Sequence, residues 1–171
     1  MKANYILICV IFFASFIGQA EESKRTYIDQ SLYSSQYQAA VNLLNSGRPA
    51  EAFPELLRFA KYGEKFAQFA VGGLMLSGDG TEQDAVEGLA WMELATEQRT
   101  SVWLSTLNSI MSQLTEEQRQ LVHTRADELR ALHGVDVQNM SCRMVKETGS
   151  NIRNHVCAKY PTTEGRYRVH R

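Results

Sequence analysis

The clearest pattern in the chain is a pair of apolar stripes of helical period that flank a polar turn. In residues 66–76 and 85–98, apolar or small residues recur three and four positions apart, as they do on one face of a helix. The stripe positions are Ala67, Ala70, Val71 and Leu74 before the turn, and Gly88, Trp91, Met92 and Ala95 after it. The pattern predicts two antiparallel helices, with Trp91 filling the angle between them.

The turn between these helices has residues suited to ending one helix and starting the next. Gly78 and Gly80 adopt positive φ at little cost, which favours a helix C-terminus and a reversal of the chain. Asp84 can accept hydrogen bonds from the free N–H groups at the start of the second helix. A single helical hairpin cannot bury its apolar face alone, so we expect similar hairpins beside it.

A weaker copy of the pattern precedes this hairpin. Two segments of helical period, residues 32–45 and 49–61, are separated by the sequence Ser-Gly-Arg-Pro. Pro54 has no backbone N–H group, so the second of these helices either kinks or becomes regular only near residue 54. The two hairpins together predict about two repeats, residues 32–66 and 67–100.

The segment after the second repeat has the features of a solenoid end. Residues 101–114 carry an apolar stripe, and Thr115 with Gln118 forms a capping box, which marks the start of another helix that Gly134 ends. This capping helix pair would cover the apolar face of the last repeat. We expect Trp103, near the join, to lie in the core; an exposed anchor for a partner is the alternative.

The central hairpin resembles a Sel-one-like repeat, a variant of the tetratricopeptide helical hairpin. The residues that carry the resemblance are Ala67, Val71, Gly72, Gly78, Gly80, Asp84, Trp91 and Ala95. Three positions depart from the family pattern, namely Met75, Thr81 and Gly88. The resemblance implies an all-α fold over residues 32–134, a short right-handed α–α solenoid, and a scaffold or adaptor role of the kind found in bacterial envelopes.

The N-terminal segment has the pattern of a secretory signal peptide. Residues 1–20 combine Lys2, an apolar run over residues 5–17 and small residues up to Ala20, so we expect cleavage after Ala20. The apolar run is shorter than the roughly 20 residues that a membrane-spanning helix needs, and an uncleaved anchor is the alternative. The mature protein would be periplasmic or secreted, without a transmembrane span, and would begin with a polar lead-in, residues 21–31.

The helical period vanishes in residues 135–171. Two short β-compatible runs flank a turn at Gly149, and a tight turn there sets Cys142 opposite Cys157, within reach of a disulfide. An oxidising compartment favours this disulfide. Zinc binding by these cysteines with His155 is the alternative, but the close Cys-x-x-Cys spacing of structural zinc sites is missing. We therefore predict a disulfide-closed β-hairpin, followed from Tyr160 by a mobile basic tail.

Charge is divided unevenly along the chain. The whole chain has a net charge of −1, whereas residues 21–141 sum to −7 and residues 142–171 to +5. The candidate basic binding patch consists of Arg143, Lys146, Arg153, Lys159, Arg166 and Arg168. These side chains could contact an anionic envelope polymer, a phospholipid surface or the acidic helical body; a solvated strand face is the alternative. Export argues against nucleic acid as a partner.

The sequence offers no recognisable catalytic, metal or cofactor motif. His123 and His133 have no Ser or Cys nucleophile in a familiar context, and His133 at a helix end is expected as a cation stabilised by the helix dipole. Gly78 and Gly80 belong to a turn without the Lys-Ser/Thr of a phosphate loop. We therefore expect no enzymatic activity, no metal and no cofactor.

Three functions remain as hypotheses. The first is an exported, non-enzymatic interaction module that binds an unidentified protein segment along the concave face of the solenoid. The second is an envelope-attachment protein whose basic hairpin binds an anionic polymer or membrane. The third is a hydrolase of the cysteine-rich repeat type, which the absence of cysteine from residues 21–141 disfavours.

Overall fold

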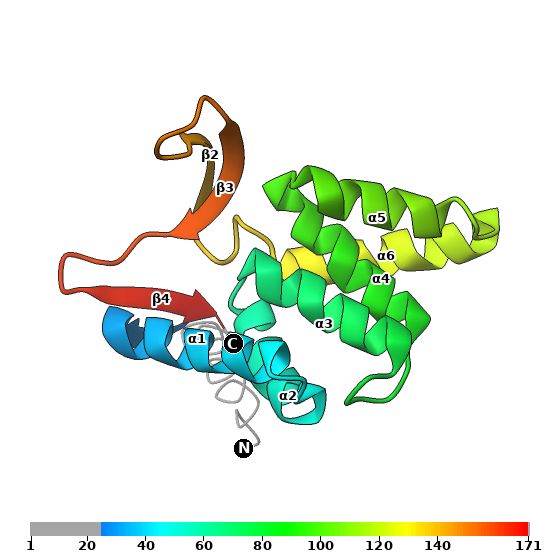
Figure 1. Cartoon of the computed structure of the whole chain (residues 1–171), viewed down its shortest axis with the longest axis horizontal. Helices are drawn as coiled ribbons and strands as arrows, with labels where there is room; N and C mark the ends of the chain where they lie inside the picture. The colour runs from blue at the N-terminus through cyan, green and yellow to red at the C-terminus, as the bar shows by residue number, and fades with distance from the viewer. Residues whose placement is uncertain (1–24, 171) are drawn as a thin grey trace, which may run out of the picture.

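Residues 25–170, which the computed structural model describes, form six α-helices and two small antiparallel sheets (Figure 1). The predictions of a signal peptide and its cleavage concern residues outside this range. In chain order the elements are β1 (Arg25–Asp29), α1 (Gln30–Asn45), α2 (Pro49–Lys61), α3 (Lys65–Ser77), α4 (Ala85–Ala95), the 3-10 turn η2 (Thr96–Gln98), α5 (Ser101–Met111), α6 (Glu116–His133), β2 (Met140–Lys146), β3 (Arg153–Lys159) and β4 (Arg166–His170).

Helices α3 and α4 form the predicted central hairpin, and two glycines let their backbones touch. A Cβ atom on Gly72 would lie 2.4 Å from the carbonyl oxygen of Gly88, and one on Gly88 would lie 2.7 Å from that of Gly72. Ala67 and Trp91 are 0% and 2% exposed. The predicted antiparallel pair, with the tryptophan buried between neighbouring helices, is confirmed.

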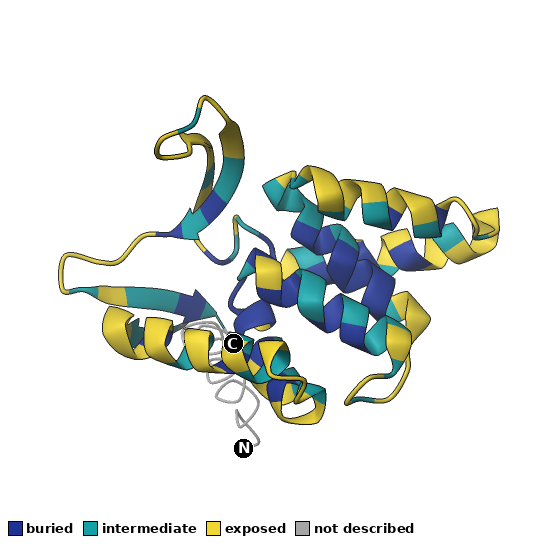
Figure 2. Ribbon diagram, viewed as in Figure 1, coloured by how far each residue is buried: buried dark blue, intermediate teal, exposed yellow. Residues whose placement is uncertain are grey.

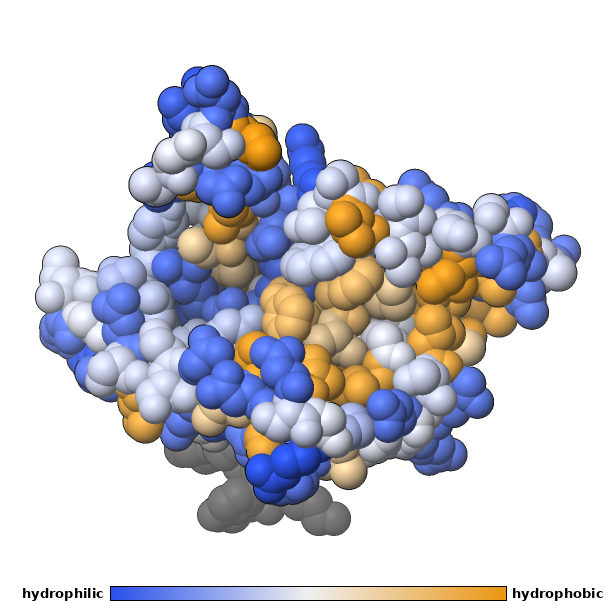
Figure 3. Space-filling view, viewed as in Figure 1, coloured by the Kyte–Doolittle hydropathy of each residue, from blue (hydrophilic) through white to orange (hydrophobic). Residues whose placement is uncertain are grey.

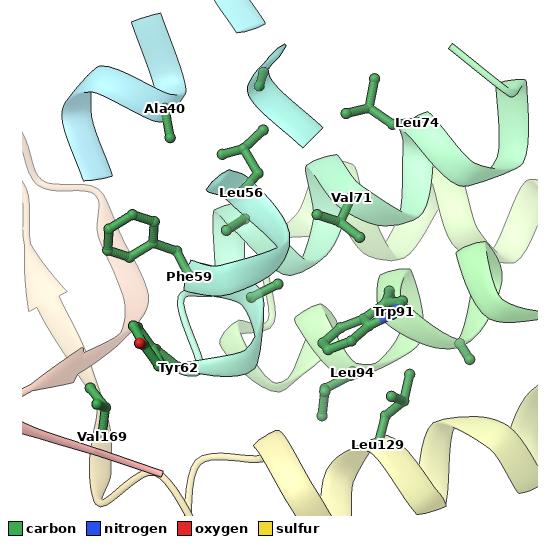
Figure 4. Packing of buried hydrophobic residues seen from close by; sticks show 14 of the residues in the cluster. Ala40, Leu56, Phe59, Tyr62, Val71, Leu74, Trp91, Leu94, Leu129 and Val169 are labelled. Carbon is green, nitrogen blue, oxygen red and sulfur yellow. The ribbon is translucent and has the colours of Figure 1, made fainter. Parts of the chain in front are cut away.

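The core runs from α1 through α2 and α3 to α4 and α6. Figure 4 shows Leu56 and Phe59 of α2, Val71 of α3, and Trp91 of α4 pointing into it. Pro54 lies on the exposed side of α2, which is helical from Pro49 onward. The inner faces of the helices are buried and their outer faces are exposed, as the predicted stripes require (Figure 2).

Side-chain caps begin three of the helices. Asp84 accepts a hydrogen bond from the N–H of Glu87, and Thr115 and Gln118 form a reciprocal capping box, both as predicted. Asp29 caps α1 in the same way by accepting from Ser31 and Leu32. Helix α1 therefore begins at Gln30, earlier than its apolar stripe indicates.

Helices α5 and α6 close the end of the stack through a second, smaller core. Its buried members come from three helices and are Leu89, Met92, Leu107, Met111 and Val122. Helix α6 also contributes Ala126 and Leu129 to the main core beside α4. The predicted capping helices thus cover apolar surface that α4 would otherwise expose.

The C-terminal hairpin has the register that its sequence predicts. Strands β2 and β3 pair antiparallel with Cys142 opposite Cys157 and Lys146 opposite Arg153. The two cysteines form a disulfide, so the zinc alternative for them is wrong. Among residues 25–170, no group of three or more His, Cys, Asp or Glu side chains is arranged to hold a metal ion.

The prediction of a mobile tail is wrong, because the tail pairs with the end of the polar lead-in. Strand β4 runs antiparallel to β1, from Arg25 opposite His170 to Asp29 opposite Arg166. Val169 is fully buried and joins the main core, which explains why the tail is ordered. The fold is therefore mostly helical with two small sheets, and not all-α.

Candidate binding groove

A groove of about 590 Å³ separates the β2–β3 hairpin from the start of α5. Figure 1 shows the hairpin standing away from the helices beside this end of α5. The groove brings together two segments more than forty residues apart, and its lining residues are Gln98, Arg99, Thr100, Ser101, Trp103, Met144, Arg153, Asn154, His155 and Val156. No single stretch of sequence could have indicated it.

One aromatic side chain, Trp103, lines the groove, and a second aromatic ring supports it from outside the lining. The Trp103 ring stacks on the ring of Phe69, with centroids 4.9 Å apart and planes 13° from parallel. Trp103 is half-buried, so its exposure lies between that of a core residue and that of an exposed anchor, the two alternatives expected from the sequence. Figure 3 shows apolar side chains gathered over α3 and beside α5.

The charged side chains of the groove are cationic. Arg99 and Arg153 are exposed, and neither forms an ion pair with an acidic residue of the described range. Arg99 adopts a left-handed conformation with φ 55°, which ends η2. The groove lining contains no carboxylate, although the helical body is acidic overall.

Buried hydrogen bonds fix the hairpin beside the helices. The Nδ1 of His155 lies 3.0 Å from the Gln98 carbonyl oxygen, to which it donates. The Nζ of Lys159 donates to the Gln138 carbonyl oxygen at 2.9 Å, and the Gln138 side chain in turn bonds the backbone of His170 in β4. These contacts hold the hairpin wall of the groove in one position.

Lys159 was predicted in a basic surface patch, and this prediction is wrong. Its side chain is 8% exposed, and burial lowers its pKa to about 8. A strand alternates its side chains between two faces, and Lys159 and Cys157 fall on the face that packs against the body. Arg153 lies on the same face but at the turn end of β3, where it is exposed, so the position along the strand decides which cation is buried.

The other five predicted patch residues lie in two places. Arg143, Lys146 and Arg153 are exposed on the hairpin, and the Arg143 guanidinium lies 5.7 Å from the centre of the Tyr160 ring. On β4, Arg166 pairs with Glu164, and Arg168 is partly buried. On the hairpin, Lys146 and Arg153 are directly opposed and share one face, and Arg143 lies on the other face.

A buried ionic network beneath the hairpin was missed from the sequence. The Nζ of Lys65 donates to Glu97 at 2.6 Å and to the side-chain oxygen of Gln68 at 2.9 Å. Burial lowers the pKa of Lys65, although Glu97 opposes that shift. Lys65 and Gln68 lie three positions apart beside the apolar stripe of α3. A polar pair on the inward face of a helix was the sequence feature that could have indicated this network.

His133 is not the exposed cation that its place in α6 predicted. Its ring stacks on Trp91 with centroids 5.5 Å apart, and its Nδ1 lies 3.0 Å from the Lys61 carbonyl oxygen. Burial lowers its pKa, which favours the neutral ring. His123 is exposed and its Nδ1 lies 2.9 Å from Glu93. Both histidines therefore serve contacts within the helical body.

Comparisons with known proteins support the fold and go no further. No protein-family model and no curated protein matches the chain. A solved structure does match: c5321, a protective antigen present in uropathogenic Escherichia coli strains, described as displaying an SLR fold, the fold of Sel-one-like repeats. The TM-score is 0.52 and the sequence identity 20%, over 68% of this chain.

This chain spans 27% of the length of that solved chain, so the likeness concerns a part of a longer array. Within residues 25–170, none of the helices is both long and apolar enough to span a bilayer. The helix packing and the structural likeness together support a helical-repeat fold for the helical part of the chain.

Proposed function

We propose that the protein is an exported, non-enzymatic interaction module that binds an extended segment of a partner protein in the groove between the hairpin and α5. The observation that carries the proposal is the groove itself, a preformed cleft lined by Trp103 and by two arginines that form no ion pair with the described acidic residues. Preformed sites bind more tightly because less conformational entropy is lost on binding. The disulfide and the buried bonds of His155 and Lys159 supply that rigidity.

The lining suits a peptide because it mixes two kinds of contact. Trp103, Met144 and Val156 offer apolar surface, while the side chains of Gln98 and Asn154 can bond the backbone of an extended chain. Arg99 and Arg153 favour a segment that carries carboxylates.

Two further features support the remaining parts of the proposal. His155 is the one imidazole in the lining, its Nδ1 donates to the Gln98 carbonyl oxygen, and no hydrogen bond joins its ring to a hydroxyl group among the described residues. A disulfide between Cys142 and Cys157 is at home in an oxidising compartment, in agreement with export.

Site-specific photo-crosslinking tests the proposal in the cells that make the protein. A photoreactive residue at Ser101 or Asn154, both exposed in the groove, should capture one partner protein through one contiguous segment. The same residue at Thr124, exposed on α6, is the matched control. Identical adducts from the groove positions and from Thr124 would refute the proposal.

Attachment to an anionic surface remains a second candidate, favoured by the exposed pair Lys146 and Arg153 on one face of the hairpin. Like charges at the directly opposed pair Lys146 and Arg153 raise the local positive potential. This function predicts salt-sensitive co-sedimentation with vesicles rich in phosphatidylglycerol, and loss of that binding in Lys146→Glu. Groove crosslinks that survive Lys146→Glu would separate the two functions.

A further inference from the structure

A second cavity lies at the base of the hairpin, between α1 and strands β3 and β4. It has a volume of about 270 Å³, and its walls include three tyrosines, Tyr33, Tyr37 and Tyr167, together with Glu64 and Lys159. Figure 3 shows the molecule hollowed, with a hydrophilic lining, between the hairpin and the part formed by α1 and β4. The groove beside α5 shares none of these lining residues.

The carboxylate of Glu64 lines this cavity and can still accept hydrogen bonds. One of its oxygens accepts a hydrogen bond of 2.7 Å from the hydroxyl of Tyr33. The other oxygen accepts none from residues 25–170, and it is not among the fully buried atoms that lack a partner. It is therefore not fully buried, and the cavity that Glu64 lines is where a ligand would reach it.

The ammonium group of Lys159 supplies the opposite charge and can still donate a hydrogen bond. An ammonium group has three N–H donors, and the two hydrogen bonds of Lys159 both go to Gln138, to its carbonyl oxygen at 2.9 Å and its side-chain oxygen at 3.4 Å. Glu64 and Lys159 attract each other, but the described residues include no direct ion pair between them. Burial raises the pKa of Glu64, and the Tyr33 hydroxyl and Lys159 oppose that shift. One acceptor and one donor that can carry opposite charges thus line the same cavity.

The tyrosines add a preference for where a positive group would sit. The faces of aromatic rings attract ammonium groups, and Tyr33 and Tyr167 lie with ring centroids 5.0 Å apart on the wall that includes Glu64. A ligand with one charge alone would leave the opposite charge of the cavity without a partner, which is costly in a partly buried site. A ligand with both charges satisfies both.

From these groups we infer that the cavity binds a small zwitterion, a free α-amino acid, with its ammonium group at Glu64 and its carboxylate at Lys159. The volume agrees, because cavities that hold drug-sized ligands begin at about 300 Å³ and this one is slightly smaller. Water is the competing occupant, since one molecule takes about 30 Å³ and several would fit.

Ligand-observed NMR on the intact, disulfide-bonded protein distinguishes these occupants. Saturation transfer at pH 7 would be measured with three probes of similar size: L-alanine, ethylamine and propionate. We expect L-alanine to bind at least about tenfold more tightly than either singly charged probe, since each of these lacks one charge-assisted hydrogen bond. No transfer to any probe would mean that the cavity holds water only and would overturn the inference; equal binding of L-alanine and ethylamine would overturn it too.

Variants connect the signal to this cavity. Glu64→Gln removes the charge but keeps an oxygen for the Tyr33 hydroxyl, and should weaken L-alanine binding about tenfold. Glu82→Gln, at an exposed loop position, is the matched control and should bind like the wild type. If Glu64→Gln does not fold, Tyr37→Leu tests the same site from α1 and should also weaken binding. Unchanged L-alanine affinity in a folded variant would refute the assignment.

Discussion

Two adjacent glycines of α3 should respond in opposite directions to the same substitution. Gly72 and Gly73 both lie inside the helix and have ordinary helical φ. A Cβ on Gly73 would meet no atom within 4 Å, whereas one on Gly72 would meet the Gly88 carbonyl oxygen at 2.4 Å and the Cγ of Met92 at 2.5 Å. We expect Gly73→Ala to stabilise the protein and Gly72→Ala to destabilise it.

The magnitude follows from two opposing effects. Alanine in place of glycine inside a helix contributes about 1 kcal/mol through helix propensity, and this gain is common to both variants. At Gly72 the helices must also separate by about 1 Å to restore an ordinary contact, which weakens the dispersion contacts between α3 and α4. Overpacking costs about 1–3 kcal/mol, and a backbone carbonyl cannot move aside as a side chain can.

The two variants should therefore differ by about 3 kcal/mol in their free energy of unfolding. Urea unfolding without reductant, followed by circular dichroism at the helical band, measures this difference. In a protein of this size it corresponds to a difference in Tm of roughly 6–12 °C. Equal stability of the two variants, or a more stable Gly72→Ala, would show that α3 and α4 do not meet at these glycines.

Three further predictions test other parts of the structure. Gly80→Ala should lose about 2 kcal/mol more stability than Gly47→Ala in urea unfolding. Both glycines have φ above 70°, but only at Gly80 would a Cβ meet backbone, at 2.4 Å from Ala50. Equal losses in the two variants would argue against contact between that turn and α2. Cys142→Ser should lower the free energy of unfolding by about 3 kcal/mol, according to the chain-entropy model. It should also speed amide hydrogen exchange in β2 and β3. Unchanged exchange would mean that the disulfide does not hold the hairpin together. The pKa of Lys159 is about 8 in the fold, and its ordinary value is 10.5, so its folded form releases a proton first. The wild type should therefore gain stability relative to Lys159→Met as the pH rises from about 8 to 10.5, with most of the gain above the folded pKa. If urea unfolding gives the same stability difference between the two proteins across this pH range, the burial of Lys159 is contradicted.

Basic residues of the hairpin show how composition alone misplaces a cation. Arg153 and Lys159 lie on the same face of β3, but Arg153 is exposed beside the turn and Lys159 is buried at the other end of the strand. Composition and alternation along the strand treat these two cations alike. Which end of β3 packs against the rest of the protein depends on contacts outside the strand, such as that of Lys159 with Gln138.

Local sequence determined the parts of this fold whose cause lies within a few residues. The helical stripes, the caps at Asp84 and Thr115, and the opposition of Cys142 and Cys157 follow from periods and turns that span fewer than twenty residues. The hydrogen bonds of these features form between residues close together in the sequence. Each helix also carries an apolar stripe to bury, whatever the distant parts of the chain are. For that reason the sequence alone was sufficient to predict them.

Tertiary structure decided everything that depends on segments far apart in the chain. Strand β1 pairs with β4 across about 140 residues, and each is too short and too polar to predict a partner alone. The groove at Trp103 and the cavity at Glu64 exist because this pairing and the hairpin contacts bring distant side chains together. Neither site has a local signature, since the free energy that holds it arises from contacts between elements and not within them.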